Sequence, residues 1–201
     1  TYPLANVMQR DAHAQSTATD IVRRESHWKA RTPHFAAVAR TRARVEHAMS
    51  RWFMDVYAGE TNAKDAEFVK VHPPIITASD CEGGGEIFRV VADADVRTDA
   101  ATPPAALTAF WGGHGAYLTV STQLHLEAFA LGLSRVWTLC PVFRAEGSAT
   151  NRHLAEFWMC EAELCWLPPG AAALGAVLDC TEQLIKAMAV SYTHLTLPTK
   201  A

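Results

Sequence analysis

Residues Pro141 to Trp166 read PVFRAEGSATNRHLAEFWMCEAELCW and combine two strand-like runs with charged side chains. Side chains alternate faces along a strand, so Arg144 and Glu146 share one face of the first run. One face of the second run carries Phe157, Met159, Glu161 and Glu163. The polar stretch GSATNRH separates the two runs. The sequence therefore predicts a β-hairpin with a long loop.

The charges on this hairpin need partners, because burying an unpaired charge costs several kcal/mol. Two interpretations fit the spacing. In the first, Arg144 forms a cross-strand ion pair with Glu161 or Glu163. In the second, the hairpin presents an arginine, carboxylates and an aromatic ring to a ligand. Spacing alone leaves both open.

Bulk composition fits one globular domain with a substantial core: 201 residues, 21.9 kDa and 49% hydrophobic residues. The net charge is −3, but residues 1–60 hold nine basic against six acidic side chains. This mild excess is compatible with RNA nearby, and a solvated helix face explains it as well. No apolar run approaches the length of a membrane span, and Thr1 begins no signal or transit pattern.

The five cysteines form no CxxC pair, and their odd number favours a reducing compartment. Cys160 and Cys165 would point to opposite faces of a strand, which is poor geometry for zinc. We therefore expect no metal site and interpret all five as small core residues, namely Cys81, Cys140, Cys160, Cys165 and Cys180.

Upstream of the hairpin, Thr32-Pro33 is typical of a helix start, and apolar residues at helical spacing predict a helix over 33–58 that ends at Gly59. The stretch 67–76, EFVKVHPPII, predicts a strand stopped by two prolines. Residues 77–88 hold three glycines and predict a mobile loop without the lysine of a phosphate-binding P-loop.

Closer to the hairpin, AYLTVST predicts a strand leading into a short helix, QLHLEAFAL. We expect Ser121 or Thr122 to cap this helix, Gly132 to close it, and Gln123 to stand at the junction. The next strand, SRVWTLCPVF, enters the hairpin. After Pro168-Pro169-Gly170 a further helix is predicted, with apolar residues at core spacing.

The hairpin sequence resembles motif 2 of the class II aminoacyl-tRNA synthetases: it reads FRAE, then a polar loop, then RHLAEFWM and E-x-E. Within that class it is most similar to the asparaginyl enzymes. Further matching stretches spread the resemblance over residues 2–190. They are YPL, RTPHFAAVARTR, ITASDCEGGGEIFRV and YLTVSTQLHLEAFALGLSRVWTLCPVFRAE.

The resemblance implies an α+β fold, the class II antiparallel sheet flanked by helices, with motifs 1 and 2 present and motif 3 missing. We expect 1–31 to be a divergent segment after an absent anticodon-binding domain, and 32–190 to be a partial catalytic domain. The tail 191–201 resembles a translated sequencing adapter, so we expect the native frame to be lost near Val190. Homodimerisation through the 33–58 helix and the 67–76 strand is also implied.

For ATP, the resemblance implies that Arg144 is the catalytic group that meets the α-phosphate. Glu146 would accept from the adenine amino group and Phe157 would stack on the ring. Arg152 and His153 would reach the β- and γ-phosphates, although a surface Arg-His pair explains these two as well. Mg²⁺ is expected with ATP, held mainly by a carboxylate in the missing part.

For the amino acid, the resemblance implies that Glu82 and Gln123 hold the ammonium group and that Glu161 accepts from a side-chain amide. The related aspartyl enzymes carry a lysine where this chain has Leu126, so asparagine is favoured over aspartate. The implied reaction is ATP-dependent ligation of asparagine to tRNA(Asn) through an adenylate.

Two rival functions remain: an aspartate–tRNA ligase of the same subclass, and a non-catalytic dimerising or binding relative. The cytosol and the mitochondrial matrix both fit such a protein. The stretches within 1–31 and 92–115 are expected to be insertions, and they favour the matrix slightly.

Overall fold

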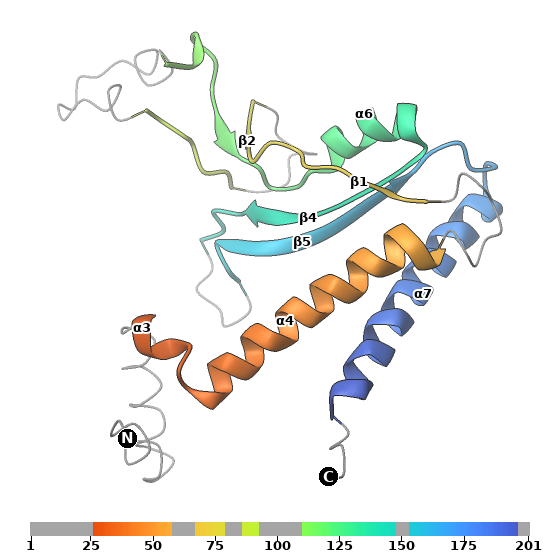
Figure 1. Ribbon diagram of the computed structural model, residues 1–201. Coiled ribbons are helices and arrows are strands. Elements are labelled where there is room, and N and C mark those ends of the chain that lie inside the picture. Colours follow the sequence, from red (N-terminus) through yellow and green to blue (C-terminus); the bar gives the residue numbers. More distant parts are fainter. Residues whose placement is uncertain (1–25, 58–66, 79–85, 93–109, 148–152, 197–201) are drawn as a thin grey trace. The chain divides into compact units, whose positions relative to one another are not determined.

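A computed structural model describes residues 26–57, 67–78, 86–92, 110–147 and 153–196 (Figure 1). The chain divides into two compact units. One comprises Thr1–Trp52 with Glu182–Ala201, and the other comprises Phe53–Thr181. The hairpin and the elements that surround it belong to the second unit, which therefore carries the candidate site.

In the first unit, the helix start at Thr32 is confirmed. A short helix, α3 (Ser26–Lys29), precedes α4 (Pro33–Arg51), and the Thr32 hydroxyl accepts a hydrogen bond from the Phe35 amide at 3.4 Å. The helical path continues as a π-helix, η1 (Trp52–Val56). Gly59, the predicted end, lies outside the described residues.

The second unit contains a three-stranded sheet in the order β1-β4-β5, formed by β1 (Val69–Lys70), β4 (Arg135–Phe143) and β5 (Glu156–Leu164). Strands β4 and β5 pair antiparallel over their whole length, from Arg135 opposite Leu164 to Phe143 opposite Glu156. The predicted hairpin is confirmed. Strand β1 instead runs parallel to β4, so the sheet is mixed.

The strand predicted over 67–76 is shorter than expected. Only Val69–Lys70 pairs with β4, and after Pro73 and Pro74 the chain forms β2 (Ile76–Thr77) in a separate two-stranded sheet. Its antiparallel partner is β3 (Tyr117–Leu118). Proline has no amide hydrogen to donate to a ladder, which explains the interruption.

The two faces of the larger sheet pack against different elements. Consecutive β4 residues point to opposite faces, and Val136 forms a buried cluster with Val71 and with Leu126 and Ala130 of α6 (Gln123–Leu133). Trp137 stacks on Phe53, with ring centroids 4.5 Å apart. Both aromatic rings are fully buried, and each such burial stabilises the fold by about 1.5–3 kcal/mol.

Helix α6 begins where predicted and ends one residue later than predicted. It runs through Gly132 to Leu133, and Ser134 takes a positive φ of 68° after the last turn. The amide of Ser134 donates to the Ala130 carbonyl at 2.8 Å, which satisfies one of the terminal carbonyls. The glycine is therefore not required as the closing residue.

The final helix, α7 (Ala171–Thr196), follows the predicted break and passes Val190 without interruption. Its apolar spacing predicted core positions, and this prediction is wrong for several of them. Leu174, Val177, Leu178 and Ile185 are exposed, because the described residues do not cover that face. No helix in the described part of the chain is long and apolar enough to cross a membrane.

The four described cysteines are free thiols, and their interpretation as core residues fits Cys180 best. Only Cys180 is buried, whereas Cys140, Cys160 and Cys165 are half-buried. Cys81 lies outside the described residues. Among the described residues no group of three or more His, Cys, Asp or Glu side chains could hold a metal ion.

Candidate functional site

A cavity of about 410 Å³ lies where the hairpin opens, between the end of β4 and the start of β5. Its lining consists of Arg144, Glu146, His153, Leu154 and Phe157. Every residue predicted to bind ATP that the structure describes is in this lining. Arg152 lies outside the described residues. The sequence pattern therefore identified side chains that meet in space.

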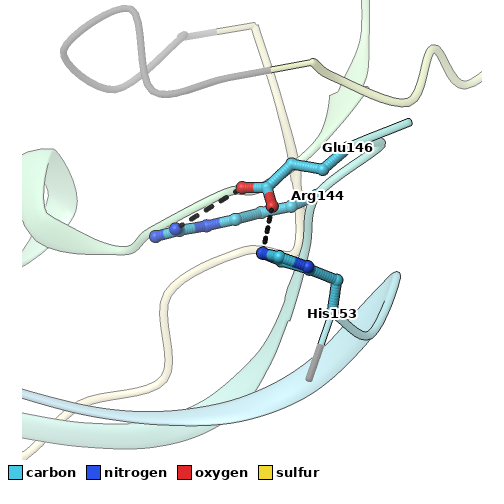
Figure 2. Close-up of polar contacts among 3 residues, drawn as sticks. All are labelled: Arg144, Glu146 and His153. Atoms are coloured by element: carbon cyan, nitrogen blue, oxygen red, sulfur yellow. Dashed lines mark ion pairs between the residues drawn. The ribbon is translucent and has the colours of Figure 1, made fainter. Parts of the chain in front are cut away.

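Polar contacts within the cavity join three of these residues (Figure 2). The Glu146 carboxylate lies between its two partners, with Oε1 4.0 Å from Arg144 Nη1 and Oε2 3.6 Å from His153 Nε2. The side chains of Arg144 and Glu146 are each 37% exposed. Solvent-exposed pairs of this kind contribute about 0–1 kcal/mol to stability, so a ligand can replace them at small cost.

The guanidinium of Arg144 also lies over the Phe157 ring, with Cζ 5.5 Å from the ring centroid. Its Nε atom is buried and has no hydrogen-bond partner among the described residues. A buried donor without a partner costs free energy, and binding sites are where such donors persist. The guanidinium is thus suited to an anionic ligand that enters the cavity.

A cross-strand ion pair of Arg144 with Glu161 or Glu163 does not form. Glu161 lies opposite Thr138 and Glu163 opposite Val136. The Arg144 amide instead donates to the Ala155 carbonyl at 3.1 Å, which places Arg144 level with Ala155. Six residues of strand, about 20 Å, separate that level from Glu161. Of the two interpretations of the charges, a ligand site agrees with this register.

Glu161 lies instead against the start of α6. Its carboxylate accepts hydrogen bonds from the hydroxyls of Ser121 and Thr122. The Thr122 amide donates to both of its oxygens, at 3.2 Å to Oε1 and 2.9 Å to Oε2. These contacts connect β5 to the first turn of α6, which begins at Gln123.

Gln123 belongs to a second group of polar side chains on α6 and β5. Its Nε2 donates to Glu127 Oε1 at 2.9 Å, one turn along the helix. Burial, and then the negative charges of Glu127 and Glu161, raise the pKa of the Glu163 carboxyl above its usual value. The negative charges of Glu127 and Glu161 thus disfavour the ionised form of Glu163.

Two further residues were predicted to bear on amino acid binding, Glu82 and Leu126. Glu82 lies outside the described residues. Glu86, further along the chain, accepts a hydrogen bond from the Ala145 amide through its backbone carbonyl, at 2.7 Å. Leu126 is fully buried in the apolar cluster beneath α6. No cation therefore stands at the position where the resemblance compares Leu126 with a lysine.

The sequence pattern missed the roles of Ser121, Thr122 and Glu127. Ser121 and Thr122 were expected only as caps. The Ser121 hydroxyl accepts from the Gln123 amide at 3.1 Å, whereas the Thr122 side chain makes no capping hydrogen bond, and both hydroxyls donate to Glu161. About forty residues separate the partners in sequence, and no local pattern joins them. The spacing of Gln123 and Glu127, four residues apart on one helix, was a signal that could have been used.

Comparison with known proteins identifies the family of this chain. The family model described as tRNA synthetases class II (D, K and N) matches residues 18–198. An asparagine–tRNA ligase of Treponema pallidum is 42% identical over 191 residues, covering 90% of this chain and 32% of the relative. The mitochondrial asparagine–tRNA ligase of Saccharomyces cerevisiae is 43% identical over 166 residues, covering 83% of this chain and 28% of the relative.

A solved structure is similar in fold as well as sequence. Asparaginyl-tRNA synthetase of Pyrococcus horikoshii, in complex with asparaginyl-adenylate, has a TM-score of 0.67 at 27% identity and covers 96% of this chain and 36% of its own. The chain thus spans about a third of the length of the relatives it matches. Because the family model covers most of its length, the chain belongs to the class II tRNA synthetases of the D, K and N group.

Proposed function

We propose that this chain forms the ATP-binding and amino-acid-binding part of an asparagine–tRNA ligase. The enzyme would join asparagine to tRNA(Asn) through an asparaginyl-adenylate. The observation that carries the proposal is the cavity in which Arg144, Glu146 and Phe157 meet, within a chain similar to asparagine–tRNA ligases. The similarity to a structure solved with asparaginyl-adenylate supports the same chemistry.

In the first step, a carboxylate oxygen of asparagine attacks the α-phosphorus of ATP. The bond from that phosphorus to the bridging oxygen breaks, and pyrophosphate leaves with the electron pair. Catalysis of such a step depends on in-line positioning and on fixed donors that meet the developing negative charge. Arg144 would supply those donors, because a guanidinium is planar and permanently charged. In the second step, a hydroxyl of the terminal adenosine of the tRNA attacks the activated carbonyl and releases AMP.

The rest of the cavity would hold the nucleotide. Phe157 would stack on adenine, a contact worth about 1–3 kcal/mol per base, and Glu146 would accept from its amino group. His153 stands at the opening of the loop and would reach the outer phosphates together with Arg152. In this arrangement ATP would replace the weak Glu146 contacts to Arg144 and His153.

The amino acid would bind near the start of α6. Gln123 would hold the ammonium group, assisted by the negative charge of the neighbouring carboxylates and by Glu82. Glu161 would accept from the side-chain amide, which would replace one of the two hydrogen bonds that the Thr122 amide makes to its carboxylate oxygens. A substrate carboxylate would be repelled there, and the buried Leu126 offers it no charge. Asparagine is thus preferred to aspartate.

Mg²⁺ is the metal expected with ATP. It usually binds through one or two protein carboxylates together with phosphate oxygens. Among the described residues no group of three or more His, Cys, Asp or Glu side chains could hold a metal ion, and none of the steps above uses one.

The proposal extends to assembly and location. A homodimer through the 33–58 helix and the 67–76 segment is supported by exposed apolar side chains on each of them, namely Val38, Val69, Ile75 and Ile76. Similar proteins include a bacterial ligase and a mitochondrial ligase of yeast, so the cytosol and the mitochondrial matrix both remain candidate locations.

The test is asparagine-dependent exchange of labelled pyrophosphate into ATP by the full translation product of the gene. We expect exchange in the wild type and a loss of about a hundredfold or more in Arg144→Lys, because lysine keeps the charge but not the planar pair of donors. Lys186→Arg on the exposed face of α7 is the matched control, with unchanged exchange. A wild type that binds ATP but supports no exchange would favour the non-catalytic relative.

A further inference from the structure

The first turn of α6 is not capped by the side chain of its N-cap residue. Thr122 is the N-cap residue, but its hydroxyl makes no hydrogen bond to the helix. The first amides of a helix need acceptors from outside the helix. Here Glu161, on a different element, accepts from the Thr122 amide with both carboxylate oxygens. A negative charge at this end also interacts favourably with the helix dipole.

The same carboxylate connects to Gln123 through Ser121. The Ser121 hydroxyl donates to Glu161 and accepts from the Gln123 amide, whose nitrogen lies 3.1 Å from Oγ. On the other side, Thr119 Oγ1 donates to the Ser121 carbonyl at 2.6 Å. Removing the carboxylate would therefore release the Ser121 hydroxyl, and with it the acceptor of the Gln123 amide.

Glu161 is itself held firmly. It lies in the interior of β5, opposite Thr138, within nine continuous pairs of the β4–β5 ladder. Two of its three donor groups are hydroxyls that can rotate, whereas the third is a backbone amide of fixed direction. Strand β5 thus fixes the position of the Glu161 carboxylate, and this carboxylate in turn holds Ser121 and Thr122 at the start of α6.

We infer that Glu161 is a positioning residue for Gln123: it caps α6 from β5 and, through Ser121, sets the place of the side chain that receives the amino group. The inference rests on the proposed function. In that function the amide of asparagine takes one of the two acceptor positions that the Thr122 amide now shares on Glu161. Glu161 would therefore affect the binding of both ends of asparagine. It would contact the side-chain amide directly, and it would position Gln123, which holds the ammonium group.

The structural part is tested on the 201-residue chain by amide hydrogen exchange in Glu161→Ala, Glu161→Gln and Ser121→Ala. Thr181→Ala is the matched control, because it also removes a hydroxyl that donates to the backbone, but on α7. In Glu161→Ala we expect exchange at both Thr122 and Gln123 to be about tenfold faster. The Gln123 amide is the decisive probe, since its direct partner, Ser121, is unchanged in that variant.

The functional part is tested by pyrophosphate exchange in the full translation product. Ser121 touches no substrate in the proposed site, so Ser121→Ala should act through the two groups that its hydroxyl contacts, the Gln123 amide and the Glu161 carboxylate. We expect its KM for asparagine to rise about fivefold, with kcat and the KM for ATP within about twofold of the wild type. Glu161→Gln keeps one acceptor oxygen and should show Gln123 exchange between that of the wild type and that of Glu161→Ala.

Unchanged Gln123 amide exchange in Glu161→Ala would overturn the inference. Faster exchange in Ser121→Ala with an unchanged KM for asparagine would also overturn it, because the turn would then be held without effect on the substrate. A wild type with no asparagine-dependent pyrophosphate exchange contradicts the proposed function instead, and the amide data would still decide whether Glu161 holds the turn. If Glu161→Ala fails to fold, as judged by its thermal transition, Glu161→Gln and Ser121→Ala carry the test.

Discussion

Two carboxylates on one face of β5 differ in what surrounds them. Glu161 is surrounded by hydrogen-bond donors from Ser121 and Thr122. Glu163, two residues further along the same face, is partly buried near Glu127 and Glu161, and its carboxyl has a raised pKa. The ionised form of Glu161 is therefore stabilised by its donors, whereas the ionised form of Glu163 is disfavoured by burial and by neighbouring charges.

Glu163→Gln should stabilise the chain at neutral pH. A raised pKa means that the folded state binds the proton more tightly than the unfolded state does. The stabilising contribution is therefore present below the ordinary value of 4.5 and is lost as the pH rises through the folded-state pKa. Urea unfolding should show the variant more stable than the wild type at about pH 7 and equal to it near pH 3.5. Glu156→Gln, at the exposed end of β5, is the control, and an equal gain there would contradict the assignment.

Cys160 and Cys180 should react slowly in the folded chain. Burial is the largest cause that raises the pKa of each thiol to about 11. The reactive thiolate at pH 8 is then about a hundredfold scarcer than for a thiol with a pKa of 9. Mass spectrometry after iodoacetamide treatment should show both cysteines labelled much faster in urea than in buffer. Equal rates in the two conditions would show that the burial is absent.

At the scale of elements, the hairpin was predictable because its charges and apolar residues alternate with the strand period over two long runs. The start of α4 was predictable from Thr32-Pro33 for an equally local reason. The parallel pairing of β1 and the contact of Glu161 with Ser121 were not, since both join residues far apart in the chain. On α7, periodicity identified the helix but not its exposure, because burial depends on what covers the face.

Thr32→Ala tests the local part of that reasoning. The Thr32 hydroxyl accepts from the Phe35 amide and donates to the Lys29 carbonyl at 2.9 Å. Loss of a helix cap costs about 1 kcal/mol. Urea unfolding followed by circular dichroism should show this loss in Thr32→Ala, and Thr32→Ser should recover most of it. An alanine variant as stable as the wild type would mean that the cap does not stabilise α4.

At the scale of the whole molecule, the chain covers about a third of the length of its relatives, and its described residues include the hairpin cavity and a separate polar group on β5 and the start of α6. The sequence predicted the residues of the cavity because one continuous stretch supplies them. It predicted Gln123 only through family resemblance, since a polar residue in the first turn of a helix has no distinguishing local signal. Residue patterns thus predict the grouping of the hairpin side chains, whereas the ligand of each residue is implied only by the family resemblance.

The most direct test of the proposed function is the choice of amino acid in pyrophosphate exchange by the full translation product. The arrangement of Glu161 and Leu126 predicts that asparagine supports exchange with a kcat/KM about 10⁴-fold or more above that for aspartate, because a site built on hydrogen bonds to an amide rejects the analogue that cannot make them. Exchange driven by aspartate and not by asparagine would contradict the account.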